Sequence, residues 1–109
     1  GRSVVITGDT RPCAATIEAA RNADLLVHEA TFGDEEAERA IETGHSTARE
    51  AAQVARDAGV RRLLLTHFSA RYSRDASELD REAKSVFSET LIGKDGLELD
   101  VPFRDAVPA

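Results

Sequence analysis

Carboxylate and imidazole side chains stand at the ends of three short apolar runs in the sequence. They are Asp9, His28, Glu29 and His67, and one more histidine, His45, directly precedes a helix-start pattern. Imidazole nitrogens and carboxylate oxygens are ligands for divalent metal ions such as zinc. The same groups carry out general acid–base chemistry near neutral pH. If these residues meet in the folded chain, they predict a site for metal and acid–base chemistry.

Each of these residues also has a structural interpretation. Asp9 suits a turn or a helix cap, His28 suits a structural position between a strand and a loop, and Glu29 suits a cap or a surface acid. His67 is harder to explain in this way, because a buried imidazole after a leucine run needs a hydrogen-bonding partner.

Other reactive side chains have simpler interpretations. Arg71 and Arg74 are by default solvated loop charges, and Cys13 is expected to be a small core residue on a helix face. The sequence contains no Gly-x-Ser-x-Gly elbow and no glycine-rich phosphate loop. Serine-hydrolase and nucleotide-binding functions are therefore disfavoured.

The elements that must position these residues alternate along the chain. Apolar runs predict strands over residues 4–7, 25–28 and 63–65, the last of them buried on both faces. Helices are expected from Pro12 onward, where Cys13, Ile17 and Ala20 share a face, and over residues 34–42 and 77–87. Alternating residues over 90–101 predict a closing hairpin.

A further helix, from Thr47 to about residue 58, has the strongest local signals. Thr47 and Glu50 fit a capping box, and Gly59 stands where a left-handed C-terminal glycine belongs. Its small-residue face consists of Ala48, Ala51, Ala52, Ala55 and Ala58. His45 lies just before this helix, and a helix N-terminus favours a phosphate group.

The order β-α-β-α-β-α-β-β predicts a layered α/β fold with right-handed crossovers. Such crossovers make the first three strands parallel if they share a sheet. The carboxyl ends of parallel strands lie at one edge, where open α/β sheets place their sites. Asp9, Glu29 and His67 are therefore expected at the same edge.

Composition limits the remaining possibilities. The 109 residues fit one small domain or a piece of a larger one, and a chain that opens on a strand without a lead-in suggests a piece. A net charge of −6 gives no general affinity for polyanions. The single cysteine excludes a disulfide within the chain and suits a cytoplasmic location. The sequence contains neither a membrane-span pattern nor a signal-peptide pattern.

Four short motifs in this chain resemble those of the tRNase Z family, in the same order. They are Gly8-Asp9-Thr10, His28-Glu29-Ala30-Thr31, Gly44-His45-Ser46-Thr47 and the run from Leu65 to Tyr72, LTHFSARY. This family comprises the tRNA 3′-processing endoribonucleases of the metallo-β-lactamase superfamily. The resemblance extends over nearly the whole chain and implies the C-terminal half of a metallo-β-lactamase αββα sandwich.

The resemblance implies a role for five residues. Asp9 corresponds to a carboxylate that bridges two zinc ions, and His67 to a terminal zinc ligand. His45 corresponds to a histidine that contacts the scissile phosphate without binding metal, and Glu29 to the group that orients it. Arg71 resembles an arginine near the substrate phosphate. The implied cofactor is Zn²⁺, with two ions in each complete site, and the implied substrate is precursor tRNA.

One departure from the family pattern is large. The first metal motif of the family, His-x-His-x-Asp-His, is absent from these residues, as is the next histidine ligand. One aspartate and one histidine cannot hold two zinc ions in four-coordinate geometry. Residues 1–109 are therefore expected to be one partial domain that is inactive alone. Half a sandwich would also expose an apolar sheet face, which predicts association with the missing N-terminal half or with a second copy as a homodimer or other homo-oligomer.

Two other functions compete with this one. The first is a related metallo-β-lactamase-fold phosphodiesterase or arylsulfatase-like hydrolase with the same metal ligands. The second is a non-catalytic fragment that associates with itself or with a partner. No membrane partner is expected.

Overall fold

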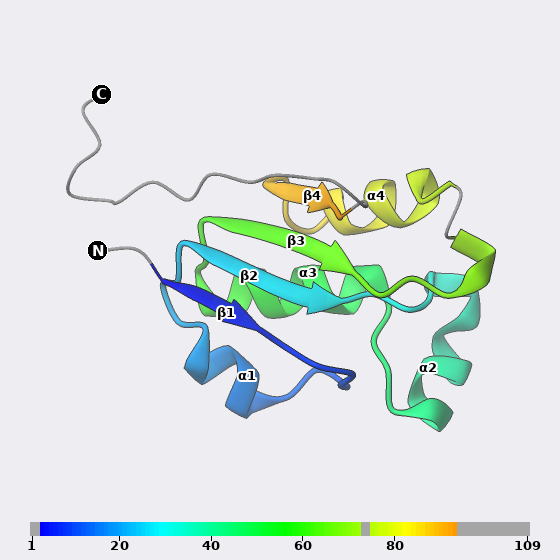
Figure 1. The fold of residues 1–109 in the computed structure, drawn as a ribbon, viewed down its shortest axis with the longest axis horizontal. Coiled ribbons are helices and arrows are strands. Elements are labelled where there is room, and N and C mark those ends of the chain that lie inside the picture. The colour runs from blue at the N-terminus through cyan, green and yellow to red at the C-terminus, as the bar shows by residue number, and fades with distance from the viewer. Residues whose placement is uncertain (1–2, 73–74, 94–109) are drawn as a thin grey trace.

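The computed structural model describes residues 3–72 and 75–93, in which a parallel sheet is backed by helices (Figure 1). The elements in chain order are β1 (Val4–Ile6), α1 (Ala14–Ala19), β2 (Leu25–Glu29), η1 (Asp34–Glu36), α2 (Ala37–Thr43), α3 (Ala48–Ala58), β3 (Arg62–Thr66), η2 (Ala70–Tyr72), α4 (Ser77–Lys84) and β4 (Thr90–Ile92). The strands lie in the order β1-β2-β3-β4, and every neighbouring pair is parallel. The predicted α/β class and parallel pairing are confirmed.

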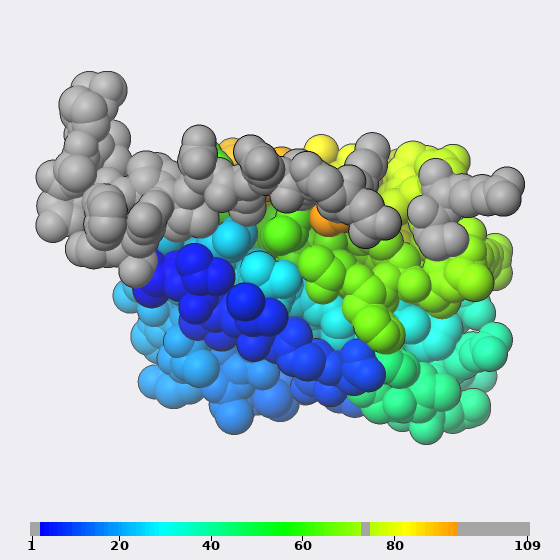
Figure 2. Space-filling model, in the orientation of Figure 1, coloured from blue at the N-terminus to red at the C-terminus, as the bar shows by residue number. Residues whose placement is uncertain are grey.

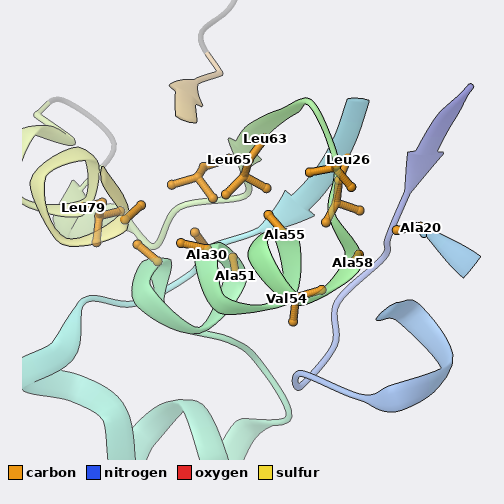
Figure 3. Close-up of a cluster of buried hydrophobic side chains, with 14 of the residues drawn as sticks. Ala20, Leu26, Ala30, Ala51, Val54, Ala55, Ala58, Leu63, Leu65 and Leu79 are labelled. Carbon is orange, nitrogen blue, oxygen red and sulfur yellow. The ribbon is translucent and has the colours of Figure 1, made fainter. Parts of the chain in front are cut away.

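The core lies between the sheet and α3 (Figure 3). Leu26, Leu63 and Leu65 point from the sheet toward the alanines of α3, and all of these side chains are buried. Small alanine side chains let the helix axis approach the sheet closely. Burial of each leucine contributes about 1.5–3 kcal/mol relative to an exposed side chain.

The local signals of α3 are confirmed. Glu50 N–H donates to Thr47 Oγ1, and Thr47 N–H donates to the Glu50 carboxylate, which completes the capping box. Gly59 ends the helix with a φ of 71°, a backbone conformation that costs glycine little because it lacks a Cβ atom. This fixed start places His45, two residues before the N-cap Thr47, beside the ends of the strands.

The face of the sheet opposite α3 carries a continuous apolar row. The strand registers align Ile6 with Val27, Val27 with Leu64, and Leu64 with Leu91. Ile6 is 72% exposed and Leu91 is 38% exposed, and atoms of β1, β2 and β3 reach this surface in Figure 2. Leu64 is half-buried, so the prediction that residues 63–65 are buried on both faces is wrong at this position.

Two sequence predictions need correction at α1 and α4. Cys13 is exposed at the N-cap of α1 and is not a core residue, because the helix begins one residue after it and its side chain contacts Thr16 instead. Helix α4 ends at Lys84 rather than residue 87. The second strand of the predicted 90–101 hairpin lies outside the described residues. Within the described ranges, every helix is too short or too polar to span a bilayer.

Candidate active site

Strands β1, β2 and β3 bring their carboxyl ends to one edge of the sheet, where four of the predicted site residues meet. Asp9 lies in the loop after β1, Glu29 is the last residue of β2, and His67 directly follows β3. His45 arrives from the loop before α3. Residues up to 58 positions apart in sequence thus become neighbours through strand register.

Asp9, His45 and His67 form a cluster in which one potential ligand atom of each lies within 4.8 Å of the others. His67 Nε2 is 3.4 Å from Asp9 Oδ1. The rings of His45 and His67 are stacked, with centroids 5.5 Å apart and planes 18° apart. The Asp9 side chain is 59% exposed and that of His67 is 54% exposed, so both are open to a ligand or to further protein groups.

Glu29 lies on the buried side of this cluster, next to His45. It is 1% exposed, so the surface-acid interpretation is wrong. Its Oε1 accepts from Ser46 N–H at 2.6 Å and Thr10 N–H at 3.4 Å, and lies 3.4 Å from His45 Nδ1. Its Oε2 accepts from the Thr31 N–H at 3.0 Å and from the Thr31 hydroxyl at 2.5 Å. A buried carboxylate needs such donors, and here they come from the loops after β1 and β2 and the loop before α3.

The backbone of His67 is left-handed, with a φ of 61°. For a residue with a Cβ atom this conformation costs on the order of 1–3 kcal/mol. Flanking backbone bonds hold it, because Ala30 N–H donates to Thr66 O and Ser69 N–H donates to Thr31 O. The conformation directs the imidazole toward Asp9 and Thr31.

Arg11 joins the loop after β1 to the start of α3. Its guanidinium makes two hydrogen bonds to Glu50, at 2.7 and 2.8 Å, and donates to the His45 carbonyl at 2.9 Å. Sequence analysis missed this residue and also assigned no role to Thr31. The available signals were the position of Arg11 two residues after Asp9 and the position of Thr31 two residues after Glu29.

Two further predicted residues lie apart from the cluster. His28 is fully buried in β2, where its Nδ1 donates to the Glu29 carbonyl at 2.8 Å; its structural interpretation is confirmed. Burial lowers the pKa of His28. Arg71 pairs with Glu35 and Glu36, lies over the Tyr72 ring, and has its pKa raised chiefly by the charge of Glu35. Arg74 lies outside the described residues.

The donor atoms in the cluster fit a divalent metal ion in type. A carboxylate oxygen and imidazole nitrogens suit zinc or a similar cation, and an exposed aspartate facing an imidazole leaves room for one. Asp9, His45 and His67 nevertheless supply at most three ligands among the described residues. A dinuclear site would need further ligands from another segment of chain.

Comparisons with known proteins point in one direction. A family model described as "Beta-lactamase superfamily domain" matches residues 1–68. A protein named Ribonuclease Z from Gemmatimonas aurantiaca is 66% identical over 101 residues, which cover 93% of this chain and 32% of the relative. A Ribonuclease Z from Haloferax volcanii is 61% identical over 107 residues, covering 97% of this chain and 34% of the relative. The chain thus spans about a third of the length of the curated relatives it matches.

Solved structures agree on the fold. The short form of human tRNase Z matches 94% of this chain and 35% of its own, with a TM-score of 0.75 and 33% identity. The metallo-beta-lactamase fold protein YhfI from Bacillus subtilis matches 89% of this chain and 39% of its own, with a TM-score of 0.80 and 35% identity. Backbone similarity is therefore about equal for the two structures, and higher sequence identity is found among the proteins named Ribonuclease Z.

Proposed function

This chain belongs to the beta-lactamase superfamily, and from that premise we propose that it is part of a metal-dependent endoribonuclease that removes the 3′ trailer of precursor tRNA. The observation that carries the proposal is the meeting of Asp9, His45 and His67 above buried Glu29, in a chain 61–66% identical to two proteins named Ribonuclease Z. A cytoplasmic location is part of the proposal.

Asp9 and His67 would hold metal. A carboxylate has two oxygens and can bridge two cations, and the exposed His67 Nε2 lies beside it at 3.4 Å. Two zinc ions would supply charge stabilisation at phosphorus and a more acidic attacking water. Their charge would also draw a polyanion to a chain with a net charge of −6.

His45 and Glu29 would carry the proton chemistry. His45 is only partly exposed, and its Nδ1 lies 3.4 Å from a carboxylate that is held by backbone donors. That carboxylate holds the imidazole ring in place, and a histidine with a carboxylate partner can act as a general acid. His45 is thereby suited to give a proton to the leaving oxygen. The half-exposed Arg71 side chain pairs with the carboxylates of Glu35 and Glu36. It would contact a substrate phosphate by exchanging one of these carboxylates for the phosphate.

The active unit needs more than residues 1–109. Two metal ligands cannot complete two zinc sites, and the row Ile6, Val27, Leu64 and Leu91 offers an apolar surface for the rest of the fold. We propose that the N-terminal half of the sandwich covers this face, and that a second copy in a homo-oligomer is the other possible cover. The 109 residues alone would associate without cleaving RNA.

A second candidate is a metallo-β-lactamase-fold phosphodiesterase or arylsulfatase-like hydrolase with another substrate. The observation that favours it is the fit to the metallo-beta-lactamase fold protein from Bacillus subtilis, whose TM-score is 0.80. The two candidates share the metal ligands and differ only in substrate.

The test uses the full-length protein that contains this chain, assayed on precursor tRNA and on bis(p-nitrophenyl) phosphate. His45→Ala should slow tRNA cleavage about 10²–10⁴-fold while zinc content is retained, and Asp9→Ala should lose zinc. Asp57→Ala removes an exposed carboxylate on α3 and should change neither. Cleavage of bis(p-nitrophenyl) phosphate without cleavage of precursor tRNA would favour the second candidate, and normal activity of Asp9→Ala would refute the metal assignment.

A further inference from the structure

Thr31 lies at the point where three site residues meet. Its side chain is buried, and its hydroxyl oxygen is 2.5 Å from Glu29 Oε2, 3.0 Å from His67 Nδ1 and 3.2 Å from His45 Nδ1. Each of these three side chains has a role in the proposed function, but the hydrogen-bonding geometry around Thr31 does not depend on that function.

The single proton of this hydroxyl can go to only one of its three neighbours. An ionised carboxylate accepts hydrogen bonds and donates none. The same Glu29 oxygen also accepts from the Thr31 N–H at 3.0 Å, so it acts as an acceptor here. The 2.5 Å separation is that of a charge-assisted O–H···O⁻ bond. The hydroxyl proton therefore points at Glu29.

The two lone pairs of the Thr31 oxygen then face the two histidines. A bond to either ring needs a proton on Nδ1, because the threonine has no second proton to donate. We infer that Thr31 sets the tautomer of both histidines, so that His45 and His67 each carry a proton on Nδ1 and present an unprotonated Nε2 to the site when neutral. Thr31 is thus a positioning residue that acts through two rings at once.

This tautomer has a consequence at Asp9. His67 Nε2 lies 3.4 Å from Asp9 Oδ1, and with its proton on Nδ1 the neutral ring brings a lone pair toward a carboxylate oxygen. Two such acceptors repel each other unless a cation lies near both. The hydrogen bond from Thr31 thereby favours a metal ion over a direct histidine–aspartate hydrogen bond. The positioning role for metal and phosphate rests on the proposed function, whereas the tautomer assignment does not.

The direct test is long-range ¹H–¹⁵N NMR on the histidine-labelled full-length protein stripped of metal, at a pH where the imidazole rings are neutral. Residues 1–109 contain three histidines, and His28 is an internal control because a backbone carbonyl already fixes its proton on Nδ1. His45 and His67 should both show a protonated Nδ1 and an unprotonated Nε2. A protonated Nε2 on either ring of the neutral wild-type chain would overturn the inference without any variant.

Substitutions then test whether Thr31 is the cause. Thr31→Val keeps the shape and removes the hydroxyl, so the tautomers of His45 and His67 should mix or reverse while His28 stays unchanged. Thr31→Ser should restore the wild-type pattern. If Thr31→Val leaves both tautomers as they were in a folded chain, the role of Thr31 is refuted. If Thr31→Val does not fold, the wild-type protein and Thr31→Ser still test the inference. Both should carry the proton on Nδ1 of His45 and His67, and a protonated Nε2 in either protein would refute it.

Metal affinity tests the functional consequence separately. In the full-length protein, loss of a hydrogen bond behind a metal ligand typically weakens binding about 10–100-fold. Competition titration with zinc should show this loss in Thr31→Val and not in Thr31→Ser. Equal zinc affinity in all three proteins would overturn the positioning role. Normal tautomers and zinc affinity with no cleavage of precursor tRNA would instead contradict the proposed function.

Discussion

Replacing Glu29 by glutamine is the sharpest test of the buried network under the site. Glutamine keeps the size of the side chain and turns one acceptor oxygen into an NH₂ donor. In the native protein, both oxygens accept backbone N–H groups, from Ser46 on one side and Thr31 on the other. Whichever way the amide turns, its NH₂ group faces a backbone donor.

The cost follows from the bonds that are lost. A hydrogen bond to a charged group contributes about 1.5–3 kcal/mol, and leaving a buried N–H without an acceptor costs about 1–3 kcal/mol. The less costly orientation of the glutamine directs its NH₂ group at Thr31. The Thr31 hydroxyl can then rotate and accept a hydrogen bond from the amide, but the Thr31 N–H is left without an acceptor. We therefore expect Glu29→Gln to lower the free energy of unfolding by about 3–5 kcal/mol.

Urea denaturation of the full-length protein measures this difference. Glu42→Gln is the matched control, because Glu42 is exposed on α2 and its substitution should change stability by less than about 0.5 kcal/mol. The reasoning is wrong if Glu29→Gln is no more destabilising than Glu42→Gln. The reversed Thr31 hydroxyl should also donate to one histidine, so the same variant should show an altered tautomer.

Three further predictions concern pH, backbone conformation and association. Burial lowers the pKa of His28, so this histidine binds a proton more readily in the unfolded chain than in the folded one. The free energy of unfolding should therefore be highest above about pH 6.5 and fall as pH drops below it. His28→Gln should flatten this dependence in denaturation curves at several pH values. Gly59→Ala should cost about 1–2 kcal/mol because φ is +71°, whereas Gly8→Ala, with open space around it, should be nearly neutral in the same thermal-unfolding assay. Ile6→Lys on the apolar sheet face should weaken association at least about tenfold, from the lost burial of one isoleucine. Ile41→Lys, at an isoleucine that is also exposed but lies on α2, should leave the sedimentation profile unchanged.

Local structure was largely predictable from sequence, because local signals depend on residues close together in the chain. The capping box of Thr47 and Glu50 and the terminal Gly59 bracket α3 as expected. Cys13 is one exception, because a helix start uncertain by one residue moves a side chain from the core face to the surface. The parallel sheet followed from element order, since right-handed crossovers leave few arrangements.

The candidate site could be predicted as a set of residues but not as a network. Alternation of strands and helices was enough to expect Asp9, Glu29 and His67 at one edge. The position of Arg11 two residues after Asp9 could mark it as a site residue but could not show that it connects Glu50 to the His45 carbonyl. Nor did the spacing of residues place Arg71 on Glu35 and Glu36.

What the sequence determined by itself is the inventory of chemical groups and the order of the elements that carry them. Tertiary structure alone decided that the Thr31 hydroxyl would stand between Glu29, His45 and His67. The physical reason is one of range. Helix caps and strand periodicity act over a few residues, whereas hydrogen bonds across the site depend on tenths of an ångström between segments tens of residues apart, which only strand register and core packing set.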